Sequence, residues 1–173
     1  MKYYINGEFV CSKDASIPFN DSGFLYGYGL FETMRFENRN IFSIDNHLNR
    51  LIAGLMIIGI KIDESKLELE NLINKVININ NIDSGIIRLM ITNGNSEQTK
   101  NNINPPRFFI SIKPFYRVPT NPVKVIYFKE SNYPIIRFTP AIKSMNYIGN
   151  MLSKKDCEKQ GAYEPVFYND NNI

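Results

Sequence analysis

One stretch decides the fold of this chain: residues 21–35, DSGFLYGYGLFETMR. Its first half places Gly23, Gly27 and Gly29 among aromatic residues, which allows close backbone approach and sharp reversals of the chain. A strand-like run over residues 30–36 follows. The glycines form no phosphate-binding P-loop, because no Gly-Lys follows them and no helix starts after a strand here. The stretch is therefore predicted to turn the chain into a strand.

The residues on both sides of this stretch predict a hairpin and two amphipathic helices. Asn6-Gly7 suits a type I′ turn between residues 3–5 and 8–10, because both central positions need positive φ. A helix is expected to start at the N-cap Asp45 and to stop at Gly59. A second helix is predicted over residues 63–79. The apolar face of the first helix consists of Leu48, Leu51, Ile52 and Leu55.

The rest of the chain continues with strands and one helix. The helix is predicted over residues 144–160, with Gly161 as its stop. Prolines at positions 114, 119 and 122 mark a linker, because proline fixes φ and lacks an N–H donor. The final residues, 169–173, resemble the turn of a further hairpin. Strands are predicted over residues 85–92, 107–113, 123–128 and 165–168.

This pattern predicts the α+β class with two lobes. A small N-terminal lobe, an antiparallel sheet with two helices, is expected over residues 1–116. An interdomain linker is expected over residues 117–122. Residues 123–173 are then interpreted as the incomplete beginning of a larger second lobe.

Composition argues against several classes of protein. The net charge of +3 on 173 residues is small and the basic residues are scattered, so no nucleic-acid surface is indicated. The apolar runs are far shorter than the ~20 residues that a membrane span requires. No signal peptide is visible, and Cys11 and Cys157 form no disulfide framework, so we expect a cytoplasmic protein. His47 is the only histidine, and without a second His or paired Cys no metal site is expected.

Two basic residues are candidates for chemistry. Lys143 stands just before a predicted helix, and a lysine held where two elements meet can lose solvation, which lowers its pKa and frees the amine to attack a carbonyl. Arg50 follows His47 by three residues, so both lie on one side of a helix. The arginine's fork of donors matches a phosphate. Taken alone, a lysine such as Lys143 is more often a solvated surface residue, and an arginine such as Arg50 more often a surface ion-pair former.

Four blocks in order resemble the class IV (branched-chain) aminotransferase family, which includes branched-chain aminotransferases, D-amino acid aminotransferases and aminodeoxychorismate lyases. The resemblance covers essentially the whole chain. It implies a D-amino acid aminotransferase-like fold with a large cofactor-binding lobe, pyridoxal 5′-phosphate as cofactor, a small-molecule substrate and a homodimer. The blocks are residues 21–35, 47–51 (HLNRL), 87–94 (IRLMITNG) and 143–148 (KSMNYI).

The resemblance implies a role for individual residues. Lys143 matches the catalytic lysine that binds the cofactor covalently and later moves the proton at the substrate α-carbon. Arg50 matches the arginine that binds the cofactor phosphate, and Tyr147 is expected to approach the cofactor ring. Phe31 matches an aromatic wall of the substrate pocket, and Arg88 an arginine near the substrate carboxylate. Plain core packing for Phe31 and a solvent-facing strand position for Arg88 are the alternatives. His47 is interpreted as structural.

The resemblance leaves the reaction open between a lyase and a transaminase. The residues of the four blocks, including LFETM at residues 30–34, favour 4-amino-4-deoxychorismate lyase. This enzyme eliminates pyruvate and releases 4-aminobenzoate in folate biosynthesis. The substrate would then be aminodeoxychorismate. Transamination of branched-chain or D-amino acids is the alternative. The D-amino acid interpretation is weakened because residues 95–100 lack an Arg-x-His.

The length of the chain departs from the family pattern. Family members usually continue for about another domain's worth of chain, beginning with a glutamate that pairs with the pyridine nitrogen. The chain therefore looks truncated after the lysine block, and we expect this polypeptide alone to be poorly active or inactive. A non-catalytic fragment or dimerisation module is the alternative of another class.

Overall fold

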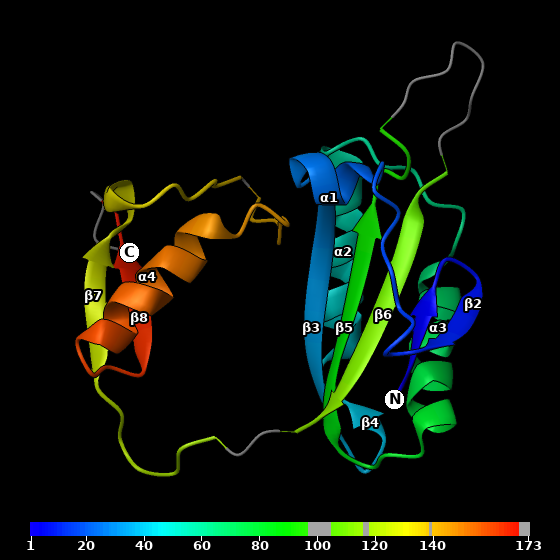
Figure 1. The fold of residues 1–173 in the computed structure, drawn as a ribbon, viewed down its shortest axis with the longest axis horizontal. Helices are drawn as coiled ribbons and strands as arrows, with labels where there is room; N and C mark the ends of the chain where they lie inside the picture. The colour runs from blue at the N-terminus through cyan, green and yellow to red at the C-terminus, as the bar shows by residue number, and fades with distance from the viewer. Residues whose placement is uncertain (97–104, 116–117, 139, 170–173) are drawn as a thin grey trace. The chain divides into compact units, whose positions relative to one another are not determined.

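A computed structural model of the chain describes residues 1–96, 105–115, 118–138 and 140–169 (Figure 1). The chain forms two compact units. The first consists of Met1–Tyr116 with Thr139–Met145, and the second of Arg117–Phe138 with Asn146–Ile173. An antiparallel sheet with two long helices in the first unit confirms the predicted α+β class. The predicted lobes (residues 1–116 and 123–173) and linker (117–122) remain predictions.

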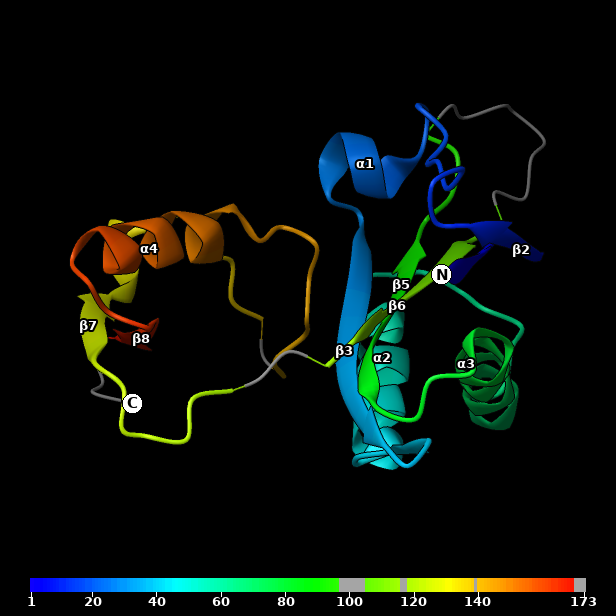
Figure 2. The same cartoon turned by 60° about the horizontal axis from the view of Figure 1, so that its bottom comes forward.

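The first unit is built on a six-stranded sheet with the order β2-β1-β6-β5-β3-β4, and each neighbouring pair is antiparallel. The predicted hairpin turn is confirmed, since Asn6 and Gly7 have φ values of 44° and 103°. Figure 2 shows β3, β5 and β6 side by side. The strands are β1 (Lys2–Ile5), β2 (Glu8–Cys11), β3 (Gly29–Glu37), β4 (Asn40–Ile41), β5 (Gly85–Thr92) and β6 (Arg107–Pro114).

The described residues of this unit form three helices. The short helix α1 (Ser22–Tyr26) was not predicted from the glycine-rich stretch; Asp21 caps it by accepting from the backbone N–H groups of Gly23 and Phe24. Helix α2 (Ile44–Ile57) begins after Ser43, so Asp45 lies in its first turn and the predicted N-cap is wrong. Helix α3 (Lys66–Asn80) begins with a capping box between Ser65 and Glu68.

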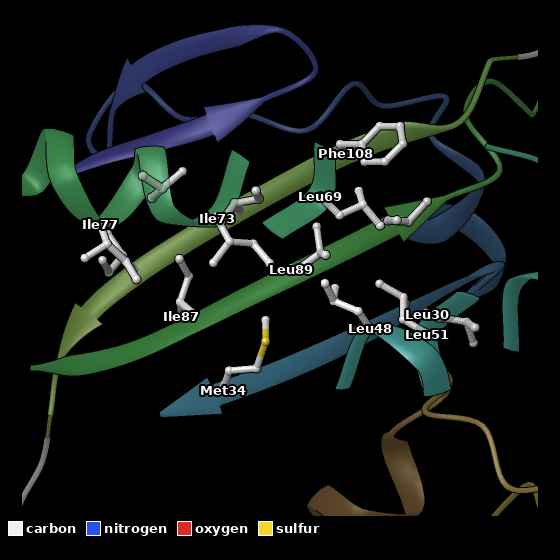
Figure 3. Packing of buried hydrophobic residues seen from close by; sticks show 14 of the residues in the cluster. Leu30, Met34, Leu48, Leu51, Leu69, Ile73, Ile77, Ile87, Leu89 and Phe108 are labelled. Carbon is white, nitrogen blue, oxygen red and sulfur yellow. The ribbon is translucent and has the colours of Figure 1, made fainter. Parts of the chain in front are cut away.

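Both long helices pack on the same face of the sheet, and the hydrophobic core lies between them and the strands (Figures 1 and 3). Side chains of a strand alternate between its two faces. On β3 the core-facing set therefore includes Leu30, Met34 and Phe36, each at most 1% exposed. Phe31 and Thr33 point to the opposite face. The core members from the helices include Leu48, Leu51, Leu69, Ile73 and Ile77.

The second unit is a small β-α-β arrangement. Strands β7 (Val125–Lys129) and β8 (Glu164–Tyr168) are parallel, and helix α4 (Ile148–Lys159) connects them after a 3₁₀ turn at Glu130–Asn132. Tyr133 packs edge-on against Phe128 and Phe167. Most of the expected terminal turn, residues 170–173, lies outside the described residues. Within the part of the chain that the structure describes, no helix has the length and apolar character needed to cross a membrane.

Candidate active site

The segment that carries Lys143 lies along the edge of β3. The N–H of Phe31 donates to the Lys143 carbonyl (3.0 Å), and the N–H of Met145 donates to the Gly29 carbonyl (3.1 Å). Strand β4 pairs only with the far end of β3, at Phe36 and Glu37. The segment after Lys143 is therefore extended, and this is why α4 begins at Ile148 rather than at the predicted residue 144.

Gly29 makes this close approach feasible. A Cβ atom at this position would lie 2.9 Å from the Met145 Sδ and 2.7 Å from the Ile91 carbonyl oxygen. The Ile91 carbonyl belongs to the backbone of the neighbouring strand, so this contact would force β3 and β5 apart, whereas the Met145 side chain would have to move. Gly29, the first residue of β3, therefore leaves room for the Met145 side chain beside the strand.

The Lys143 side chain is half-buried over an aromatic ring. Its Nζ atom lies 4.6 Å from the centroid of the Phe31 ring. Burial lowers the pKa of the Lys143 amine; the carboxylate of Glu32 opposes this shift, and the positive charges of Arg50 and Arg88 add to it. A larger fraction of this amine is consequently neutral and nucleophilic than for an ordinary surface lysine.

Arg50, on α2, is held in a two-pronged ion pair with Glu32. Its Nε atom lies 2.6 Å from Glu32 Oε1, and its Nη2 atom 2.6 Å from Glu32 Oε2. Hydrogen bonds to Glu32 raise the pKa of Arg50. The carboxylate is 1% exposed and the arginine side chain 46% exposed. The pair thus fixes the guanidinium while Nη1 takes no part in it.

Glu32 is the site residue that sequence reasoning did not single out. His47 Nδ1 also contacts it, at 2.7 Å from Oε2. A signal for it was present: the two-residue period of β3 places Glu32 on the core face between Leu30 and Met34, where a charge needs partners. The helical spacing of His47 and Arg50 provides two such partners on one side of α2.

Phe31 and Arg88 lie together on the other face of the sheet. The Arg88 guanidinium carbon is 5.1 Å from the Phe31 ring centroid, and Arg88 Nε donates to Thr33 Oγ1 at 3.1 Å. Phe31 is 8% exposed, so it is also a packed residue. Arg88 borders a cavity of about 300 Å³, whose other lining residues are Tyr3, Thr33, Ile86, Ser111, Ile112 and Lys113.

Four of the five predicted site residues therefore belong to the first unit: Phe31, Arg50, Arg88 and Lys143. Tyr147 is in the second unit, where it precedes α4 and is 39% exposed. Its role near a cofactor stays a prediction. The roles of the other four likewise stay predictions.

An amine of lowered pKa near a fixed guanidinium suits the class of proteins that bind a carbonyl compound with an anionic group. The family follows from comparison with known proteins. The model of the family "Amino-transferase class IV" matches residues 29–173. The chain belongs to this family, as the resemblance of the four blocks predicted.

The chain is similar to proteins with different names. D-alanine aminotransferase of Listeria monocytogenes serotype 4b is 30% identical over 178 residues, covering 97% of this chain and 60% of the relative. Branched-chain aminotransferase of Thermoproteus uzoniensis shares the fold with a TM-score of 0.83 at 18% identity, covering 99% of this chain and 60% of that one. A Legionella pneumophila protein provisionally named 4-amino-4-deoxychorismate lyase has a TM-score of 0.77 at 22% identity, with coverages of 92% and 59%.

The chain spans about 60% of the length of the curated relatives that it matches. The likeness to the two solved structures concerns the fold, because their sequence identity is low.

Proposed function

We propose that this chain carries the lysine-bearing part of a pyridoxal-phosphate-dependent active site that processes an amino compound. The observation that supports this most directly is the Lys143 amine, half-buried over Phe31 with a lowered pKa. Membership of the class IV aminotransferase family supports the same chemistry. One solved branched-chain amino acid aminotransferase of similar fold is a complex with pyridoxamine 5′-phosphate.

The donor set of the first unit fits this cofactor. An aldehyde needs a neutral amine, and a phosphate needs a fixed cation; Lys143 and Arg50 supply one each. Pyridoxal phosphate, when bound, supplies an aldehyde for an amine and a ring that accepts electrons from the substrate α-carbon. In this proposal Lys143 is the attachment point and Arg50 binds the phosphate. Tyr147 is proposed to approach the ring.

The proposed catalytic work of the chain is proton transfer by Lys143. Once an amino substrate has replaced it, the amine of Lys143 takes the proton from the substrate α-carbon and can return one to a neighbouring carbon. Its lowered pKa increases the fraction of the amine that is neutral and able to accept that proton. Phe31 is proposed as a wall of the substrate pocket. Arg88, beside the cavity, is proposed to bind the substrate carboxylate.

Two outcomes of this proton removal are open, and they define the finer proposals. Loss of pyruvate from aminodeoxychorismate gives 4-aminobenzoate; reprotonation gives amino transfer from branched-chain or D-amino acids. Pyruvate release from aminodeoxychorismate would favour the lyase, which the sequence blocks favour. Amino transfer from D-alanine or leucine with no pyruvate elimination would favour a transaminase instead.

A homodimer is part of the proposal. Three aromatic side chains around α1 are exposed: Phe19 by 81%, Phe24 by 60% and Tyr26 by 69%. Neighbouring apolar side chains that face water are typical of contact surfaces. We propose that a second copy of the chain covers them.

Cofactor capture tests the central proposal. The chain is incubated with pyridoxal phosphate, reduced with borohydride, and mapped by peptide mass spectrometry. We expect the phosphopyridoxyl group on Lys143, together with a visible absorption band before reduction. Lys143→Ala should lose both signals, and Lys61→Ala, which alters an exposed lysine of the first unit, should retain them. Equal labelling of several lysines, unaffected by Lys143→Ala, would refute the proposal.

A further inference from the structure

The core face of β3 contains one charged side chain, Glu32, among the apolar residues Leu30, Met34 and Phe36. A buried carboxylate loses its hydration, so its place in a core must be compensated by donors. Glu32 is 1% exposed and receives three: Arg50 Nε, Arg50 Nη2 and His47 Nδ1, at 2.6, 2.6 and 2.7 Å. Stability alone does not call for this arrangement, because apolar residues of similar volume often replace a buried ion pair without loss.

The geometry of the pair determines where the arginine points. The Glu32 carboxylate accepts hydrogen bonds from Nε and Nη2 on one side of the guanidinium. This is the bidentate geometry in which arginine binds carboxylates. An arginine bound in this way loses most of its rotamer freedom before any ligand arrives. Nη1 is not part of the pair, and nearly half of the side chain remains exposed. One edge of the guanidinium is anchored, and the other is available to an anion.

The same carboxylate also acts on Lys143. Its negative charge opposes the effect of burial on the amine, and Arg50 acts in the opposite direction. Phe31 and Glu32 are consecutive residues of β3, and the Lys143 carbonyl accepts the N–H of Phe31. Lys143 and Arg50 are thus both held by adjacent residues of β3: the Lys143 segment by Phe31, and the Arg50 guanidinium by Glu32.

We infer that Glu32 is a positioning residue, which orients Arg50 so that its guanidinium receives the phosphate of the cofactor at a fixed place relative to Lys143. This inference rests on the proposed function, because it assigns Arg50 to the phosphate. It goes beyond it in making phosphate recognition depend on a residue that touches neither cofactor nor substrate. Preorganised donors bind better because the ordering has been completed beforehand.

The test compares two aldehydes that differ only in the phosphate, pyridoxal 5′-phosphate and pyridoxal. Glu32→Gln keeps the shape but removes the charge and one of the paired acceptors. We expect the affinity for pyridoxal phosphate, relative to that for pyridoxal, to fall about tenfold or more, in line with charge-assisted hydrogen bonds. A change in the reactivity of Lys143 would alter both affinities alike, so it cancels in the ratio of the affinity for pyridoxal phosphate to the affinity for pyridoxal.

Three further variants sharpen the comparison. Arg50→Lys should give the same phosphate-selective loss, and the double variant Glu32→Gln/Arg50→Lys should lose little more than either single variant, because both remove one interaction. Glu37→Gln is the matched control: Glu37 is on the same strand and pairs with Arg35, but it is 48% exposed. It should change neither affinity. If Glu32→Gln does not fold, Glu32→Asp is used, and a smaller loss of the same selectivity is expected.

A measurement on the ligand-free chain separates the inference from the proposed function. The Arg50 Nε–H proton should exchange slowly with water in the wild type and rapidly in Glu32→Gln, as followed by NMR. Loss of affinity for both aldehydes alike, or no loss for either, overturns the inference while cofactor capture by the wild type stands. If the wild type captures no cofactor, the proposed function fails, and an Arg50 Nε–H proton that exchanges rapidly in the wild type then overturns the inference as well.

Discussion

Replacing Arg50 by methionine should destabilise the first unit by leaving a buried carboxylate almost alone. The variant removes two hydrogen bonds to Glu32 of 2.6 Å each and retains only that of His47. Hydrogen bonds to charged groups contribute about 1.5–3 kcal/mol each, and breaking a buried ion pair costs about 3–5 kcal/mol. Because the arginine itself is 46% exposed, we expect the low end, about 3 kcal/mol.

The same substitution in a Glu32→Leu variant tests whether the unpaired carboxylate causes the loss of stability. In Glu32→Leu the buried charge is gone, so Arg50→Met should cost less than about 1 kcal/mol there. The matched control is Arg39→Met. Arg39 also pairs with a carboxylate, Asp83, but the two side chains are 43% and 74% exposed. Exposed pairs contribute about 0–1 kcal/mol, so this variant should be close to the wild type.

Native-state hydrogen exchange of β3 and β5 amides, measured along a urea series, assigns the free energy of unfolding to this unit. It avoids treating a chain with two units as a single transition. The reasoning is refuted if Arg50→Met costs no more than Arg39→Met, or if its cost is the same in the Glu32→Leu background.

Three other results are expected. The lowered pKa of Lys143 means that its neutral amine persists to lower pH, so in competitive acetylation its labelling should begin at lower pH than that of a free lysine derivative added as the reference amine; coincident profiles would contradict this. Arg88→Gln should raise KM for a carboxylate substrate about tenfold or more, with the cofactor band unchanged, since one charged contact is lost; an unaltered KM would exclude Arg88 from substrate binding. Phe24→Ser with Tyr26→Ser should weaken self-association in sedimentation, and an unchanged sedimentation profile would rule this surface out as the dimer contact.

Local sequence determined most of the elements, because their signals are short-range. The positive φ values at Asn6-Gly7 were predicted from turn chemistry, and strand β5 coincides with the predicted residues 85–92. Even the family followed from four blocks. The predictions that failed locally concern helix starts: the N-cap of α2 is Ser43 rather than Asp45, and the cap of α1 by Asp21 was overlooked.

The start of α4 depends on tertiary structure alone. Residues 144–147 have no local feature that forbids a helix, but the backbone groups of the segment from Lys143 to Met145 bond to the edge of β3. A hydrogen-bonding partner more than a hundred residues away in sequence is invisible to helical periodicity. This pairing also places the Lys143 amine over Phe31, so the lowered pKa is a property of the fold and not of the sequence around the lysine.

The chain's sequence by itself determined which family the chain belongs to, because residue types in a fixed order are enough for that, and it named the residues that are proposed to carry the chemistry. Only the tertiary structure decided that Arg50 is anchored by Glu32 and that the Lys143 amine lies over the Phe31 ring, which Arg88 also contacts. The physical reason is that burial and charge act through space, over distances of a few ångströms between residues that the chain keeps far apart.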